Sequence, residues 1–258
     1  MGQDQRERFL VVGAGRTGSS LLCAVLAAAG ADFGMPADQV WAADDGAFEH
    51  ADVTRAAAWF TVADRLGAVR PLWPRRWIWD AARHHAKMHL RHALAAAQFV
   101  KGPNLDLTVQ LTAKFGYLPR IVVSHRSFAP QAMSLALRAA GLDTRAIEAY
   151  YLRTYKNALL WLHVYGGCTV DFDDLIDPQK TQWLDAVAEV TGLSRRRMAA
   201  ARAARLDPGR APRHSPPVLS PECERLHACL CDLRGQVVLP SRLAARAPAL
   251  RLASRQAA

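Results

Sequence analysis

The sequence predicts an α/β fold, a three-layer α/β/α domain with a central parallel sheet of about four to five strands. Short apolar runs of strand length alternate along the chain with longer segments of helical periodicity. The apolar runs are continuous, which is typical of strands that helices cover on both faces. The chain has 258 residues, of which 51% are hydrophobic, enough for one large domain with a substantial core.

The first strand and helix enclose a glycine-rich turn. Residues 8–12 predict a buried strand, residues 19–29 predict a helix, and the turn between them reads Gly13-Ala14-Gly15-Arg16-Thr17-Gly18. Such a turn is typical of a phosphate-binding loop, because its N–H groups and the helix N-terminus favour an anion. The spacing of Gly13 and Gly18 matches the start of a Walker A loop and predicts a P-loop-type fold, but Ser19 replaces its lysine.

A dinucleotide-binding loop is the alternative for the same residues, since Gly13-Ala14-Gly15 with Gly18 also fits Gly-x-Gly-x-x-Gly. That motif requires an acidic residue about 20 positions further on, at the end of a second strand. Asp32 and Asp38 lie near this distance, but Gly34-Met35-Pro36 does not resemble a strand ending.

The later elements follow the same alternation. Strands are predicted over residues 98–101, 120–124 and 168–172. Helices are predicted over about 50–66, 80–97, 107–115, 129–140, 143–165, 178–192 and 221–234, with Asp143 as an N-cap. The carboxyl ends of parallel strands meet at one edge, where ligands bind. We therefore expect the loop, Lys101, residues 125–127 and Asp173 to share that edge.

The tail of the chain differs in composition. We expect a single domain over residues 1–240 and a flexible tail over 241–258. The arginine-rich segment 195–213 has two interpretations, a lid over a bound anion or a solvated basic surface.

Charge and composition limit the class of protein. The net charge of +10 indicates an anionic partner (nucleotide, nucleic acid, acidic glycan or membrane surface) or a solvated basic face. The N-terminus is polar and charged, and no apolar run reaches about 18 residues. We therefore expect a cytoplasmic protein without a membrane span or a signal peptide.

The five cysteines are spread unevenly, which predicts a reducing compartment and no disulfide framework. Cys223, Cys229 and Cys231 form no Cys-x-x-Cys pair, so no metal site is expected from them. Cys23 and Cys168 lie in apolar surroundings and are interpreted as core residues.

Aromatic and basic residues are mixed over residues 71–87, where Trp73, Trp77 and Trp79 occur among arginines and histidines. Tryptophan and arginine together can stack on sugars or bases. The alternative is an amphipathic helix with its tryptophans in the core and its basic side in water.

Several of these motifs resemble those of P-loop sulfotransferases, the bacterial type in particular. Residues 13–22 look like that family's 5′-phosphosulfate loop, and residues 121–126 with Ser134 look like its 3′-phosphate motif. Residues 170–178 are similar to its Tyr-Glu-Asp-Leu and Asp-Pro segment, and residues 46–50 resemble Gly-Tyr-Trp-Glu-Asn. The resemblance covers roughly residues 9–192.

The resemblance implies a transferase that uses 3′-phosphoadenosine 5′-phosphosulfate (PAPS) and releases the 3′,5′-bisphosphate. The acceptor would be a hydroxyl or amine of a small molecule or saccharide, attacking by metal-independent in-line displacement. The implied cofactor-binding residues are Gly15, Arg16, Thr17, Gly18, Ser19, Ser20, Arg126 and Ser134.

The same resemblance implies two catalytic residues. Arg16 would stabilise negative charge on the bridging oxygen, and Glu49 would act as the general base. The alternative bases are His50, His84 and His85. Lys101 matches the lysine of a family Lys-Asp-Pro-Arg segment, but Lys101-Gly102-Pro103-Asn104 lacks its aspartate and arginine.

Two other classes remain open. A small-molecule kinase would use Asp171 or Asp173 to hold magnesium, although it would lack the Walker lysine. A non-catalytic protein could bind a nucleotide or an acidic polymer through the basic surface. We expect no stable nucleic-acid partner, and the sequence leaves the oligomeric state open.

Overall fold

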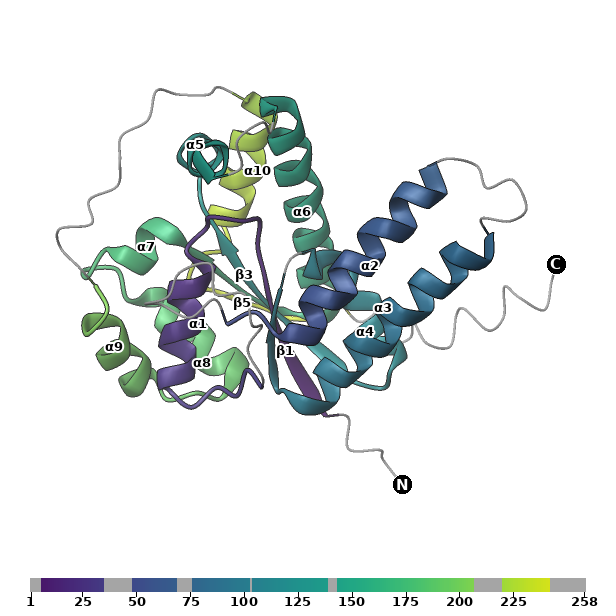
Figure 1. The fold of residues 1–258 in the computed structure, drawn as a ribbon. Coiled ribbons are helices and arrows are strands. Elements are labelled where there is room, and N and C mark those ends of the chain that lie inside the picture. The colour runs from purple at the N-terminus through teal and green to yellow at the C-terminus, as the bar shows by residue number, and fades with distance from the viewer. Residues whose placement is uncertain are drawn as a thin grey trace.

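The computed structural model describes residues 6–34, 48–68, 76–102, 104–138, 143–206 and 220–241 (Figure 1). They contain one sheet with the strand order β2-β1-β3-β4-β5. Its strands are β1 (Glu7–Val12), β2 (Phe99–Lys101), β3 (Leu118–His125), β4 (Gly167–Asp171) and β5 (Val237–Val238). The first four are parallel, as the sequence predicts, whereas β5 pairs antiparallel with β4 and was not predicted.

Both faces of the sheet are buried, and the side chains of each strand alternate between two cores. Leu10 and Val12 of β1 belong to one core, and Phe9 and Val11 belong to the other. The stacked rings of Phe9 and Phe99, 4.6 Å apart, join neighbouring strands on the second face. Helices must cover both faces, which explains the continuous apolar runs in the sequence.

Two groups of helices provide this cover (Figure 1). The first face packs against α2 (Ala51–Ala68), α3 (Arg76–Ala96), η1 (Leu105–Leu107), α4 (Val109–Lys114), α5 (Phe128–Arg138), α6 (Thr144–Tyr165) and α10 (Pro221–Cys231). The second packs against α1 (Ser19–Ala28), α7 (Phe172–Ile176), α8 (Gln182–Thr191) and α9 (Arg195–Ala203). The arrangement is compatible with a three-layer α/β/α fold.

Helix ends follow the local signals in most places. The Asp143 carboxylate accepts a hydrogen bond from the Arg145 N–H and caps α6, as predicted. Gly192 ends α8 in the left-handed conformation, with φ 72°. The prediction that α8 opens at Pro178 was wrong, because α8 begins at Gln182 and residues 172–176 form the unpredicted helix α7.

The basic segment of α3 is amphipathic. Ala82, Ala86 and Leu90 are buried, whereas His84 and His85 are exposed on the opposite side. This confirms the amphipathic interpretation over residues 80–96, although the predicted roles of Trp73, Trp77 and Trp79 concern side chains outside the described part. No helix in the described ranges is both long and apolar enough to cross a bilayer.

Some of the remaining sequence predictions fall on described residues, and others do not. Cys23 and Cys168 are fully buried, as predicted, and all five cysteines are unpaired. Residues 35–47, the second half of the arginine-rich segment and residues 242–258 of the predicted tail lie outside the described residues.

Candidate functional site

The glycine loop, residues 13–18, connects β1 in the middle of the sheet to α1. A Cβ on Gly13 would lie 2.5 Å from the Ser124 carbonyl oxygen, so only glycine allows this approach to β3. Gly18 is the N-cap of α1 and has φ 76°, and Arg16 has φ 71°. A left-handed conformation is uncommon for arginine and is typical of functional loops.

One hydrogen bond within the loop and one to β3 fix its conformation. The Thr17 hydroxyl is buried and donates to the Ala14 carbonyl at 3.1 Å. The Ser124 hydroxyl donates to the Thr17 carbonyl at 2.9 Å. The Thr17 side chain therefore supports the shape of the loop, and its role in holding an anion stays a prediction.

The loop meets α5 and α6 through two further hydrogen bonds. The Arg16 Nε–H donates to the Ser134 hydroxyl at 2.9 Å, and the Gly15 N–H donates to the Tyr150 hydroxyl at 3.2 Å. Burial raises the pKa of Tyr150, so the phenol stays neutral beside the loop. Tyr150 was not predicted, because its position on α6 carries no local sign of a loop contact.

A lysine and a carboxylate lie beside the first turn of α1. Lys101, at the end of β2, is almost fully buried, and its Nζ donates to the Ser20 hydroxyl at 2.9 Å. The same Nζ lies 3.8 Å from Glu49 Oε1, and the Glu49 side chain is 24% exposed. The structure thus brings Glu49, the predicted base, together with Lys101 and Ser20. The neighbouring Ser19 is half-buried.

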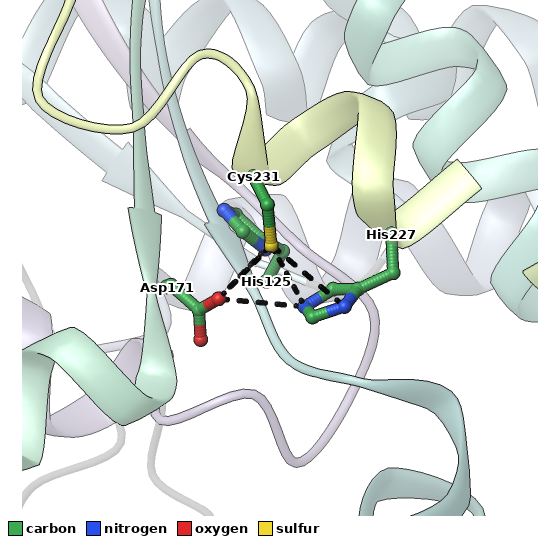
Figure 2. A group of neighbouring side chains, drawn as sticks. All are labelled: His125, Asp171, His227 and Cys231. Carbon is green, nitrogen blue, oxygen red and sulfur yellow. Dashed lines mark hydrogen bonds and ion pairs between the residues drawn. The ribbon is translucent and has the colours of Figure 1, made fainter. Parts of the chain in front are cut away.

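A second group of polar side chains lies where the carboxyl ends of β3 and β4 meet α10 (Figure 2). It consists of His125, Asp171, His227 and Cys231. Asp171 Oδ1 accepts from the Asp173 N–H and caps α7, and Oδ2 lies 3.4 Å from His227 Nε2. Burial raises the pKa of Asp171, but the hydrogen bond from His227 and nearby positive charge outweigh it and hold that pKa far below its usual range.

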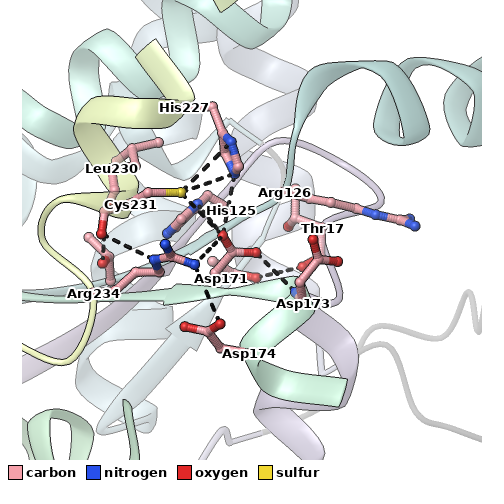
Figure 3. Close-up of polar contacts among 12 residues, drawn as sticks. Thr17, His125, Arg126, Asp171, Asp173, Asp174, His227, Leu230, Cys231 and Arg234 are labelled. Atoms are coloured by element: carbon pink, nitrogen blue, oxygen red, sulfur yellow. Dashed lines mark hydrogen bonds and ion pairs between the residues drawn. The ribbon is translucent and has the colours of Figure 1, made fainter. Parts of the chain in front are cut away.

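Arg126 extends away from that group (Figure 3). Its guanidinium lies over the Phe172 ring, 4.2 Å from the centroid, and burial lowers its pKa against the opposing charges of Asp173 and Asp171. A Cβ on Gly18 would lie 2.4 Å from the same ring. Phe172 therefore connects the glycine loop to Arg126.

The histidines considered as alternative bases lie in two places. The backbone N–H of His50 donates to the Lys101 carbonyl at 3.2 Å, whereas His84 and His85 belong to α3. His50 is buried, its Nδ1 accepts from the Asp52 N–H at 3.1 Å, and its Nε2 lies beside Gly34. Burial lowers the pKa of His50. His84 and His85 lie on the exposed side of α3, where His85 stacks on Trp59.

The described part of the arginine-rich segment packs against the domain rather than over the loop. Arg202 of α9 is buried and donates to the carbonyls of Asp174, Leu175 and Asp177. Arg195 pairs with Asp185 of α8. Residues 207–213 of the same segment lie outside the described part.

A cavity of about 380 Å³ lies at the opposite edge of the sheet, between the starts of β1 and β2. Its lining includes Arg8, Asp32 and Gln98. None of the candidate residues at the glycine loop lines it.

No known protein-family model matches this chain, and none of the curated proteins is significantly similar to it in sequence.

Proposed function

We propose that this chain is a sulfotransferase that moves the sulfuryl group of PAPS to a hydroxyl or amine of a small-molecule or saccharide acceptor. The support is a glycine loop with a P-loop spacing at the carboxyl edge of a parallel sheet. Basic and hydroxyl groups from β2, β3, α5 and α6 contact this loop or the first turn of α1.

The observation that carries the proposal is the hydrogen bond between Arg16 and Ser134, at 2.9 Å. Arg16 belongs to the loop expected to hold the 5′ end of the cofactor, and Ser134 belongs to the motif expected to hold its 3′-phosphate. Because one nucleotide carries both anions, the two motifs must lie close together. A bound bisphosphate would replace the present Arg16–Ser134 bond with contacts to its own oxygens.

The residues present fit anions at the 5′ and 3′ positions of one adenosine. The Gly13 position leaves no room for a Cβ because the Ser124 carbonyl oxygen lies there, so the glycine lets the loop pack closely on the end of β3. The Arg126 Nε is buried and has no hydrogen-bond partner among the described residues, so an oxygen acceptor would satisfy it.

Each remaining group has a role in the transfer. PAPS supplies an activated sulfuryl group whose bond to the phosphate oxygen breaks as the acceptor attacks sulfur. Arg16 and the loop N–H groups stabilise the charge that develops on that oxygen. Glu49 takes the acceptor proton, and its Oε1 lies 3.8 Å from the Lys101 Nζ.

The cofactor assignment is tested by equilibrium binding of adenosine 3′,5′-bisphosphate, AMP, ATP with magnesium and single-stranded DNA. Wild type should prefer the bisphosphate to AMP. Arg126→Met should reduce that preference by about 10- to 150-fold, since hydrogen bonds to charged groups contribute about 1.5–3 kcal/mol. Arg196→Met is the control, because Arg196 is exposed on α9.

Three outcomes would overturn the assignment. Preference for ATP with magnesium would indicate a kinase. Salt-sensitive binding of DNA alone would indicate a non-catalytic binder. Equal discrimination between bisphosphate and AMP in wild type and Arg126→Met would exclude Arg126 as the 3′-phosphate ligand.

The base assignment concerns the chemical step alone. Glu49→Gln should lower the rate of sulfuryl transfer to a saccharide or amine acceptor by about 10²- to 10⁴-fold while bisphosphate affinity stays within twofold. Mass spectrometry of sulfated products measures the rate. An unchanged rate in Glu49→Gln would move the role of base to another residue.

A further inference from the structure

We propose that His125, Asp171, His227 and Cys231 form a zinc site that joins the ends of β3 and β4 to α10 (Figure 2). The site is separate from the glycine loop, and the proposal does not depend on the sulfotransferase assignment.

The backbone places the four side chains together. His125 and Asp171 are the last residues of β3 and β4 and face each other in the sheet register. His227 and Cys231 are four residues apart on α10, so they lie on one side of that helix. Three elements distant in sequence thus converge on one point.

The distances among the donor atoms of Asp171, His227 and Cys231 match those of a tetrahedral zinc centre, and His125 lies slightly further away. Zinc bonds of 2.0–2.3 Å place neighbouring donors about 3.3–3.7 Å apart. Cys231 Sγ lies 3.3 Å from Asp171 Oδ2 and 3.6 Å from His227 Nε2, and His227 Nε2 lies 3.4 Å from Asp171 Oδ2. His125 Nδ1 lies 3.9 Å from Asp171 Oδ2, and one donor atom from each residue fits within 4.8 Å of the others.

His125 is the residue that points to a ligand. Its side chain is 0% exposed, and neither ring nitrogen has a hydrogen-bond partner among the described residues. A buried polar group without a partner costs free energy, so such groups usually mark an absent ligand or a functional role. Coordination to a metal would satisfy one of the two nitrogens.

The charges of the site balance around a divalent ion. On binding, the Cys231 thiol would release its proton to solvent, so the thiolate and the Asp171 carboxylate would neutralise Zn²⁺. Arg234 Nη1 now lies 3.7 Å from Asp171 Oδ2, but it also lies 3.5 Å from Asp174 Oδ1. Asp174 can therefore retain the arginine when the metal takes over Asp171.

The types of donor atom indicate which metal would bind, and their number indicates whether the site is structural. Nitrogen, sulfur and carboxylate donors together suit zinc rather than magnesium or calcium. All four positions come from the protein, which is typical of a structural site. The ion would also fix Arg126 and Phe172, the residues that directly follow His125 and Asp171 in the sequence.

The test uses the full chain, stripped with a chelator and titrated with zinc chloride against a competing chelator. Wild type should bind one equivalent and show a rise in Tm. Cys231→Ser should lose more than about 100-fold in zinc affinity, above the 10- to 100-fold that loss of an outer-shell contact costs. Cys229→Ser is the matched control, because Cys229 is exposed two residues earlier on the same helix.

A second pair of variants tests a histidine ligand. His125 is buried, so its replacement could prevent folding, and His227 is used instead. His227→Ala, at a half-buried position, should lose zinc binding, whereas His163→Ala, an exposed histidine of α6, should keep it. Cobalt(II) should give a thiolate charge-transfer band in wild type that Cys231→Ser lacks. Binding below one equivalent in wild type, or equal affinity in Cys231→Ser and Cys229→Ser, would overturn the site.

Discussion

At the scale of single residues, two left-handed positions in the glycine loop determine how it meets its neighbours. Arg16 at φ 71° directs its guanidinium to Ser134, and Gly18 at φ 76° starts α1 against the Phe172 ring. Left-handed backbone costs about 1–2 kcal/mol for a residue other than glycine. The backbone is therefore strained at Arg16 but not at Gly18, because glycine adopts this conformation without a penalty.

Gly18→Ala should destabilise the protein by more than a backbone penalty alone. The new methyl would lie 2.4 Å from the Phe172 ring and force it to move. Gly192→Ala is the control, because Gly192 has φ 72° and nothing within 4 Å of its Cβ position. We expect Gly18→Ala to lose about 1–3 kcal/mol more than Gly192→Ala in urea unfolding. Equal losses would show that Phe172 does not restrict the loop.

Asp106 should give the protein a measurable pH dependence. It is buried and accepts from the Asn157 amide at 2.9 Å, yet burial outweighs this bond and raises its pKa. The folded state therefore binds a proton more readily than the unfolded state, and stability from this group increases as the pH falls.

Asp106→Asn removes this titration while it keeps an acceptor for Asn157. As the pH falls from 7 toward the ordinary aspartate pKa of about 4, wild type should gain unfolding free energy relative to Asp106→Asn. The two urea series measure the difference, and a difference that is constant over this range would contradict the raised pKa.

At the scale of elements, α9 holds the short helix α7 in place. Arg202 donates to the Leu175 and Asp174 carbonyls at 2.9 Å each and also to the Asp177 carbonyl. These carbonyls lie at the C-terminal end of α7, where a helix leaves its last acceptors unpaired. α7 begins with Phe172, so the contact also supports the residue under Arg126.

Arg202→Met should destabilise the protein by about 2–4 kcal/mol, because two buried carbonyls and one half-buried carbonyl lose their donor. Arg202→Lys should restore little of this loss, since an ammonium cannot reproduce the planar guanidinium contacts. Arg196→Met, at an exposed position of the same helix, should stay within about 0.5 kcal/mol of wild type. Denaturant unfolding distinguishes these values. An Arg202→Met variant as stable as wild type would show that α7 does not need the hydrogen bonds from Arg202.

At the scale of the whole molecule, the sheet separates two cores. Helix α10 completes the core on the first face, and β5 extends the sheet. Leu226 and Leu230 of α10 are buried against the first face, and β5 pairs with β4. Burying a leucine contributes about 1.5–3 kcal/mol, whereas a domain is stable by only about 5–15 kcal/mol in total. Residues 220–238 therefore belong to the folding unit although they follow the arginine-rich segment.

Two truncated chains test this division. A chain that ends at residue 241 should keep the thermal unfolding of wild type, which is the expectation for a flexible tail. A chain that ends at residue 206 loses α10 and β5 and should not show cooperative unfolding by circular dichroism. Cooperative unfolding of the shorter chain near the wild-type Tm would exclude α10 from the core.

The order of elements follows from the sequence because apolar runs, glycines and capping residues act locally. Residues 8–12 and 120–124 could be assigned to buried strands, and Asp143 to an N-cap, without knowledge of the rest of the chain. β5 and α7 escaped prediction because each is short and depends on a partner, β4 for one and Arg202 for the other.

By itself, the sequence determined the glycine loop, its place between the first strand and the first helix, and the polar residues at the strand ends. Only the tertiary structure decided which of those residues meet, because contacts such as Arg16–Ser134, Gly15–Tyr150 and Lys101–Glu49 join positions far apart in the chain. The same is true of His125, Asp171, His227 and Cys231, whose spacing matches no metal motif. The physical reason is that strand register and helix packing, rather than local sequence, bring these donor atoms within reach of one another.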